Sequence, residues 1–261
     1  MEETGTRRAT RERHEALLAL LRAGVDSVET LADQAGVSPS TVRRDLARLE
    51  RDGSIARTYG GALVRDEVFH ERPFGESAQL NAEAKAAIAA RAAELVPAEG
   101  TVFLDAGTTC LALARLLVTA GPLTVVTRGL ESALLLSRAA GVRVIVVGGQ
   151  VQPLSHGVVG PLASVALDRL AFDVAFLGAD TVDPERGLGE PTVEETHVKE
   201  VAARQARRVV LLADSSKLEA ANAPAWTRVQ PGWTLLTDAA APAAVVAAFE
   251  ERGVTVVAAG S

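Results

Sequence analysis

The stretch 37–50, Val-Ser-Pro-Ser-Thr-Val-Arg-Arg-Asp-Leu-Ala-Arg-Leu-Glu, constrains the fold most, because the ends and faces of a helix can be read from it. Ser38 can cap the free amides of the first turn, Pro39 suits the first helical position, and Gly53 can end the helix in the left-handed conformation. At about 100° per residue, the apolar side chains share one side and most arginines the other. The stretch therefore predicts an amphipathic helix over about 39–52.

Two shorter helical patterns precede this helix, at 12–23 and at 28–35, and Gly36 ends the second. Two helices joined by a tight glycine turn form a helix-turn-helix. After Gly53, the residues 54–64 read as a small hairpin turning at Tyr-Gly-Gly, which is typical of a wing. Residues 1–65 are therefore predicted to form a winged helix-turn-helix that binds DNA.

The polar side chains of this unit suit the two kinds of DNA contact. Phosphate contacts position a protein, whereas contacts to base edges select a sequence. We expect the hydroxyls and guanidiniums near the start of the 39–52 helix to enter the major groove, and the later arginines and the hairpin to contact phosphates or the minor groove. The candidate DNA contacts are Ser38, Ser40, Thr41, Arg43, Arg44, Arg48, Arg57 and Tyr59. A merely solvated charged face is the alternative, and the cap, turn and hairpin together argue against it.

Composition narrows the class of protein. A net charge of −6 and a pI near 5.4 suit a site-selective DNA binder better than a protein that coats nucleic acid. No apolar run approaches the roughly 20 residues that span a bilayer, and the N-terminus lacks the pattern of a secretory signal, so a cytoplasmic protein without membrane contact is expected. One cysteine and four scattered histidines predict no disulfide, metal or cofactor. Cys110 is expected to be a small buried side chain rather than a reactive thiol.

A second domain is predicted after a polar segment, 66–80, which Pro73 and Gly75 interrupt and which has the character of a linker. From residue 81 to 261, helical patterns alternate with short apolar strands, which predicts an α/β domain with a mainly parallel, doubly wound sheet. The predicted strands are 101–105, 123–127, 142–147, 174–178, 209–213 and a last one at 254–258. The predicted helices are 82–95, 109–118, 130–139, 161–170 and 193–206.

Polar loops follow several of these strands, and in such sheets ligands bind beyond the carboxyl ends of the strands. The loop 105–109, Asp-Ala-Gly-Thr-Thr, opens a helix and offers hydroxyls and free amides that suit a phosphate. The pair Gly148-Gly149 permits close backbone approach to a ligand, and a plain turn explains it equally well. The loops 178–180, Gly-Ala-Asp, and 214–217, Asp-Ser-Ser-Lys, add carboxylates, hydroxyls and a cation at the same end of the sheet.

Lysine is rare in this chain, since Lys85, Lys199 and Lys217 stand among 27 basic residues. A compact point charge suits a phosphate site, which draws attention to Lys217 at a strand end. Lys199 lies one helical turn after Glu195, so both side chains can face the same cleft. An ordinary surface pair at positions i and i+4 is the alternative for these two residues.

In their order along the chain, these motifs resemble the DeoR family of bacterial transcriptional regulators from Glu12 to the C-terminus. The resemblance rests on the 37–50 helix with Gly60-Gly61-Ala62, on Phe-Leu-Asp-Ala-Gly-Thr-Thr at 103–109, and on the glycine and aspartate loops named above. It implies a winged helix-turn-helix joined to a sensor domain with a sugar-phosphate isomerase-like fold. It also implies a repressor of catabolic genes that binds double-stranded operator DNA and a phosphorylated sugar or related metabolite.

The resemblance also assigns effector contacts: to phosphate Gly107, Thr108, Thr109 and Lys217, and to the sugar or its supporting residues Asp105, Asp180, Glu195 and Lys199. Gly149 joins them as a candidate. Arg128 departs from the family, which commonly has asparagine after the threonine of this strand; it can add an anionic contact or point outward.

The sequence also leaves two alternative functions to consider, and it predicts an oligomeric state. Residues 178–183 with Glu195 resemble the acidic loop of ribose-phosphate isomerases, where carboxylates can move a proton, so an isomerase is the alternative function. The DNA-reading unit argues for a binding protein, because a fold does not by itself carry an activity. A purely structural module leaves the polar loops unexplained. A homo-oligomer, dimer or tetramer, is expected because paired recognition helices read paired half-sites.

Overall fold

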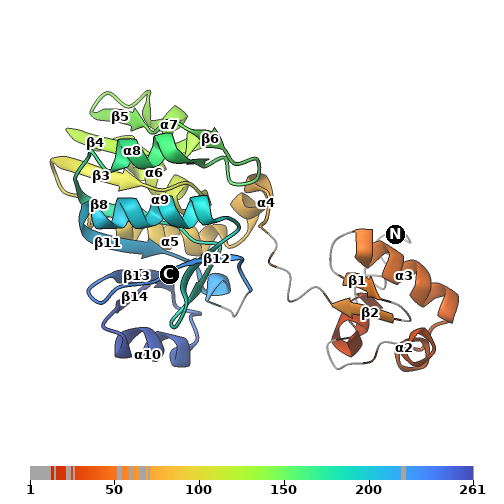
Figure 1. The fold of residues 1–261 in the computed structure, drawn as a ribbon. Helices are drawn as coiled ribbons and strands as arrows, with labels where there is room; N and C mark the ends of the chain where they lie inside the picture. The colour runs from red at the N-terminus through yellow and green to blue at the C-terminus, as the bar shows by residue number, and fades with distance from the viewer. Residues whose placement is uncertain are drawn as a thin grey trace, which may run out of the picture. The chain divides into compact units, whose positions relative to one another are not determined.

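The computed structural model of the chain describes residues 13–14, 16–21, 25, 27–51, 55–58, 61–64, 69, 71–218 and 222–260, with the backbone alone at 51, 56–58 and 61–64. The chain divides into two compact units, residues 1–68 and 69–261 (Figure 1). Among the described residues, no helix has both the length and the apolar character needed to cross a bilayer.

The first unit is a winged helix-turn-helix, as the sequence predicts. Helical residues between 13 and 21 precede α2 (Val28–Ala35) and α3 (Pro39–Arg51), and β1 (Ile55–Thr58) pairs antiparallel with β2 (Gly61–Val64). Gly36 ends α2 in the left-handed conformation, with φ 65°, and the Thr41 amide donates to the Ser38 hydroxyl at 3.2 Å at the start of α3. The core of this unit consists of Leu17, Leu21, Leu31, Ala32, Val42, Leu46, Leu49 and Ile55.

The second unit is built on a seven-stranded sheet in which every neighbouring pair of strands is parallel, in the order β14-β13-β11-β8-β3-β4-β5. The mainly parallel α/β domain is thus confirmed. Its strands are β3 (Gly100–Leu104), β4 (Leu123–Thr127), β5 (Val142–Val146), β8 (Phe172–Leu177), β11 (Ala206–Leu212), β13 (Thr234–Asp238) and β14 (Thr255–Ala259).

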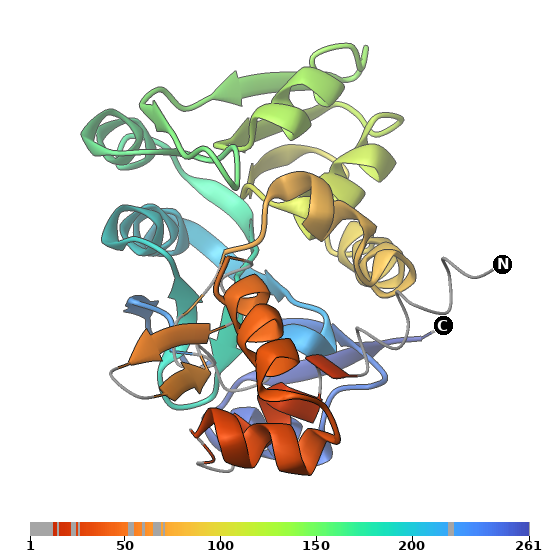
Figure 2. The same cartoon turned by 90° about the vertical axis from the view of Figure 1, so that its right-hand side faces the viewer.

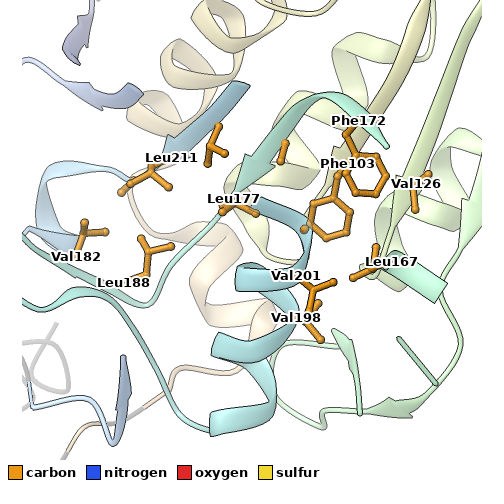
Figure 3. Close-up of a cluster of buried hydrophobic side chains, with 14 of the residues drawn as sticks. Phe103, Val126, Leu167, Phe172, Leu177, Val182, Leu188, Val198, Val201 and Leu211 are labelled. Atoms are coloured by element: carbon orange, nitrogen blue, oxygen red, sulfur yellow. The ribbon is translucent and has the colours of Figure 1, made fainter. Parts of the chain in front are cut away.

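Helices cover both faces of this sheet, as Figure 2 shows with the two helical layers on opposite sides of the strands. The first layer consists of α5 (Ala82–Ala93), α6 (Thr108–Leu117) and α7 (Leu130–Leu136); the second consists of α8 (Pro161–Leu167), α9 (Val193–Arg204) and α10 (Ala243–Glu251). Because side chains alternate along a strand, Val102 and Leu104 pack under the first layer and Phe103 under the second. Phe103 lies against Phe172, with ring centroids 5.6 Å apart (Figure 3).

Several short elements were not predicted. A hairpin of β6 (Gln150–Val151) and β7 (Val158–Val159) follows β5, and β12 (Ala225–Thr227), β10 (Gly187–Glu190) and β9 (Thr181–Asp183) form an antiparallel sheet. The 3₁₀ turn η2 (Ser215–Lys217) follows β11.

The segment expected as a linker, 66–80, differs from that expectation in its second half, which contains α4 (Phe74–Gln79) and belongs to the second unit. The Phe74 amide donates to the Leu154 carbonyl at 2.9 Å, and the Phe74 ring stacks on the His156 ring with centroids 5.4 Å apart. The Phe74 ring and backbone amide thus fix this half to the sheet domain.

Candidate functional site

A polar cleft lies at the carboxyl ends of β3 and β8, the neighbouring strands at which the strand order reverses direction. The chain runs from β3 outward to β4 and β5 and then returns to β8 on the other side, which makes this the switch point where α/β sheets bind ligands. The cleft has a volume of about 640 Å³, including space open to solvent. Eight of the sequence-predicted residues line it: Gly107, Thr108, Thr109, Arg128, Asp180, Glu195, Lys199 and Lys217.

Asp105 lies beneath the residues that line the cleft and binds two of them, Arg128 and Lys199. Its carboxylate is fully buried and accepts hydrogen bonds from the Ala106 amide at 2.7 Å and the Gly178 amide at 3.1 Å. The side chains of Arg128 and Lys199 also donate to it. Burial alone raises the pKa of a carboxyl, but the two cations outweigh it, so the pKa of Asp105 lies below its ordinary value. Asp105 is therefore an ionised anchor for two cations.

Arg128 does not point outward, which excludes one of the two possibilities that the sequence leaves open for it. Its side chain is 2% exposed, and its Nε–H pairs with Asp105. Its Nη1 lies 4.0 Å from Glu195 Oε1 and, among the described residues, has no hydrogen-bond partner. Arg128 thus faces the cleft with one unsatisfied donor while its charge is held by Asp105.

Glu195 and Lys199 also differ from an ordinary surface pair, since each is only 1% exposed. The Lys199 ammonium donates to the Gly178 carbonyl at 2.8 Å, whereas the Glu195 carboxylate accepts from the Thr192 hydroxyl at 2.9 Å and the Ser155 hydroxyl at 3.1 Å. The two side chains therefore share the inner face of α9 and bind different partners.

Glu190 is a buried acid of this site that sequence reasoning missed, and it lies 3.1 Å from the Lys199 ammonium. Burial raises the pKa of Glu190 to about 8, although the Lys199 charge opposes the shift. Glu190 ends a strand without apolar alternation, so no sequence pattern pointed to it.

The outer part of the cleft has the features expected of a phosphate site. Gly107 precedes α6 with φ 107°, and no side chain of the described residues caps the first-turn amides of this helix. Free amides at a helix N-terminus attract anions. The Lys217 ammonium lies 3.3 Å from the Asp180 carboxylate and is about one-fifth exposed. Asn81 donates to Asp214 at 2.8 Å and thereby holds the loop that carries Lys217.

Gly149 and Cys110 have structural explanations. Gly149 does not line the cleft; its φ is 149°, and a Cβ atom there would come within 2.2 Å of the Val159 carbonyl oxygen. Cys110 is buried, and burial raises the pKa of its thiol well above the ordinary range, which agrees with a small buried side chain. Among the described residues, no cluster of histidine, cysteine or acidic side chains is arranged to hold a metal ion.

The cleft also contains residues from the segment that was expected to be a linker. Glu71, Arg72, Phe74 and Ser77 line it, and so does Lys85 of α5. Lys85 donates to the Ser77 and Leu80 carbonyls, and burial lowers its pKa. Sequence reasoning missed Glu71 because nothing in a polar segment marks one carboxylate as part of a site.

In the first unit, α3 has the two faces that the sequence predicts. Val42, Leu46 and Leu49 are buried, and the candidate DNA contacts Ser38, Ser40, Arg43, Arg44 and Arg48 are exposed, with Thr41 half-buried. The Ser38 hydroxyl lies 2.9 Å from the hydroxyls of Ser40 and Thr41. The Arg57 side chain and Tyr59 lie outside the described residues.

Asp45 is a feature of α3 that the sequence analysis did not find. It is 7% exposed, accepts from Arg13 Nε at 2.6 Å and lies 3.2 Å from His14 Nε2. Asp45 thus connects the recognition helix to the helical residues near the start of the chain.

A winged helix-turn-helix unit in one chain with an α/β unit that contains a polar cleft defines a helix-turn-helix transcriptional regulator. Residues 13–68 match the DeoR-like helix-turn-helix domain, and residues 80–239 match the DeoR C terminal sensor domain. The chain belongs to the DeoR family of transcriptional regulators.

Similar proteins carry names of the same kind. The chain is 37% identical to the HTH-type transcriptional regulator GlpR of Haloferax volcanii, over 88% of this chain and 90% of that protein. It is 31% identical to the transcriptional repressor AccR of Agrobacterium fabrum, over 88% and 90%, and 30% identical to the HTH-type transcriptional repressor CsqR of Escherichia coli, over 94% of both chains. The family and these names identify a transcriptional regulator rather than an enzyme.

Solved structures with a similar arrangement include ribose 5-phosphate isomerase A of Methanocaldococcus jannaschii, with a TM-score of 0.39 and 20% identity over 53% of this chain and 55% of that one. They also include the sorbitol operon regulator SorC of Klebsiella pneumoniae, with a TM-score of 0.35 and 14% identity over 80% and 90% of the two chains.

Proposed function

We propose that this regulator is a homo-oligomeric, sequence-specific repressor of carbohydrate metabolism genes, and that a phosphorylated sugar or related metabolite in the cleft controls its operator affinity. The observation that carries the proposal is the presence in one cleft of a phosphate-type site and an acid-rich inner part. The exposed face of α3 supplies the DNA contacts.

The two parts of the cleft suit the two ends of a sugar phosphate. The free amides at the start of α6 and the Lys217 ammonium suit a phosphate dianion. The carboxylates of Asp180 and Glu195 and the Ser155 hydroxyl lie along the same cleft and suit the hydroxyls of a sugar. An unphosphorylated sugar satisfies only the second part, so we expect it to bind poorly.

The DNA contacts are proposed from α3. Ser40, Thr41, Arg43 and Arg44 lie in its first turns and suit base edges, whereas Arg48 lies further along and suits phosphate. Arg44→Ala is expected to cost about 1 to 3 kcal/mol and to relax the preference at one base position. Binding to an operator library by wild type and variant tests this; an unchanged base preference would contradict the docking of α3.

The ligand proposal is tested by titrating operator DNA with the full chain in the presence of ribose 5-phosphate or fructose 6-phosphate, and of ribose or fructose. We expect the phosphorylated compounds alone to change operator affinity, by a factor of roughly 5 to 150. Lys217→Gln should weaken their effect and leave affinity without ligand nearly unchanged. Arg115→Gln, which removes an exposed cation of α6 outside the cleft, is the control. Equal responses of wild type and Lys217→Gln would remove Lys217 from the site.

A further inference from the structure

Glu71 occupies a special position along the chain. The first unit ends at Val68, so Glu71 follows it by three residues, yet its side chain lines the cleft of the second unit. The chain is next fixed at Phe74, whose backbone amide donates a hydrogen bond to the Leu154 carbonyl and whose ring stacks on His156. Among the cleft-lining residues, Glu71 is therefore the one nearest in sequence to the DNA-binding unit.

The surroundings of Glu71 leave one of its oxygens without a partner. Its Oε1 is buried and makes no hydrogen bond among the described residues. An unsatisfied buried acceptor is costly, and a bound group commonly explains it. Glu195 and Asp180 line the same cleft, and their charges raise the pKa of Glu71, while the Ser155 hydroxyl and the Arg128 charge act in the opposite sense.

This arrangement selects the kind of group that can bind next to Glu71. A phosphate or carboxylate is repelled by the three acids, whereas a hydroxyl can donate a hydrogen bond to the free oxygen and lie between them. Burial and the charges of Glu195 and Asp180 raise the pKa of Glu71 to about 7, so a neutral donor that relieves this crowding is favoured.

We propose that Glu71 is an effector-contacting residue that accepts a hydrogen bond from a hydroxyl of the ligand and thereby couples occupation of the cleft to the DNA-binding unit. The inference rests on the proposed function and adds the residue through which ligand binding changes DNA affinity. A ligand changes DNA affinity only by binding two arrangements of the chain unequally. Glu71 follows the first unit by three residues, so a ligand contact there lies close along the chain to the DNA-binding unit.

The test compares ligand affinity and operator affinity in the full chain for wild type, Glu71→Ala and Glu71→Gln. Ribose 5-phosphate and fructose 6-phosphate are the probes. The coupling factor, operator Kd with probe divided by operator Kd without it, is expected to fall at least fivefold in Glu71→Ala. Operator affinity without probe should stay within twofold of wild type, which also shows that the variant folds. The matched control is Glu76→Ala, which removes an exposed carboxylate of α4 and should keep the wild-type factor.

A coupling factor in Glu71→Ala equal to that of wild type and of Glu76→Ala overturns the inference. If wild type itself responds to neither probe, the proposed function fails for these ligands and the inference falls with it, a result distinct from failure of the variant alone.

A ligand-free measurement tests the placement of Glu71 independently. Because the pKa of Glu71 is raised to about 7 in the folded chain, its ionisation lowers the stability of the fold as the pH rises from about 4.5 to about 7, and the loss stays constant above that. Glu71→Gln is therefore expected to raise the melting temperature more at pH 8 than at pH 5. An equal change at both pH values would show that Glu71 does not lie among the cleft carboxylates, and would overturn the inference.

Discussion

Asp105 and Arg128 form an ion pair at the floor of the cleft in which neither side chain is more than 2% exposed. Asp105 directly follows β3 and Arg128 directly follows β4, so the pair joins the carboxyl ends of two neighbouring strands. Removing one member of such a pair leaves the other as a buried charge with fewer partners.

Arg128→Gln is therefore expected to lower the free energy of unfolding by about 3 to 5 kcal/mol, at the lower end because Lys199 still donates to Asp105. Chemical denaturation of the full chain measures this loss. The control is Arg91→Gln, which removes the exposed partner of Glu94 and should cost at most about 1 kcal/mol. Equal losses in the two variants would contradict the role assigned to Arg128.

Asp45→Asn is expected to destabilise the DNA-binding unit by about 1.5 to 3 kcal/mol, because it weakens charged hydrogen bonds from Arg13 and His14. Hydrogen exchange of the α3 amides reports this loss, with Asp33→Asn on α2 as the exposed control. Burial acts to raise the pKa of Asp45, but its two partners outweigh it and lower the pKa, so the contribution is complete above about pH 4 and disappears as the pH falls through the lowered value. A variant as stable as wild type at pH 7 would refute this expectation.

The second unit is expected to lose stability as the pH rises from about 4.5 to about 8. Folded Glu190 keeps its proton up to a pKa of about 8, whereas the unfolded chain releases it near the ordinary value, so unfolding releases a proton throughout this range. Melting temperatures across this range, for wild type and Glu190→Gln, test the effect. The variant should show a smaller slope than wild type and than the exposed control Glu83→Gln; equal slopes would exclude Glu190 as the source.

Self-association is expected to use the outer face of α8. Leu162 and Val165 lie three residues apart on this helix, are 70% and 58% exposed, and share a face. Leu162→Glu should shift the full chain toward smaller species in sedimentation velocity. Leu134→Glu introduces the same charge at an equally exposed leucine of α7, in the other helical layer, and should not. An unchanged distribution in Leu162→Glu would place any interface elsewhere.

The sequence predicts the elements whose signals are local. The capped helix α3 and the apolar strands β3 and β4 were predicted within one or two residues, because caps and short apolar runs depend on neighbouring positions. The strand β10, Gly-Leu-Gly-Glu, has no such pattern and was missed.

Contacts between side chains that lie far apart along the chain could not be predicted from the sequence. Arg128 is buried because Asp105, 23 positions earlier, neutralises it, and the sequence alone does not reveal this pairing. Glu71 lies in a polar segment whose burial depends on Phe74 and on the hairpin of β6 and β7. The strand-end loops showed where the cleft forms, and long-range packing decided which residues complete it.

The position of the cleft between β3 and β8 also divides the sheet by chain order. One block consists of the consecutive strands β3 to β5 and the other of β8, β11, β13 and β14, and the backbone pairing of β3 with β8 joins them. A molecule held by the loop after β3 and by Lys217, which follows β11, would bind to both blocks at once. Occupation of the cleft would then make the two halves of the sheet unfold together, and a metabolite would protect the whole second unit from proteolysis rather than only the loops that it contacts.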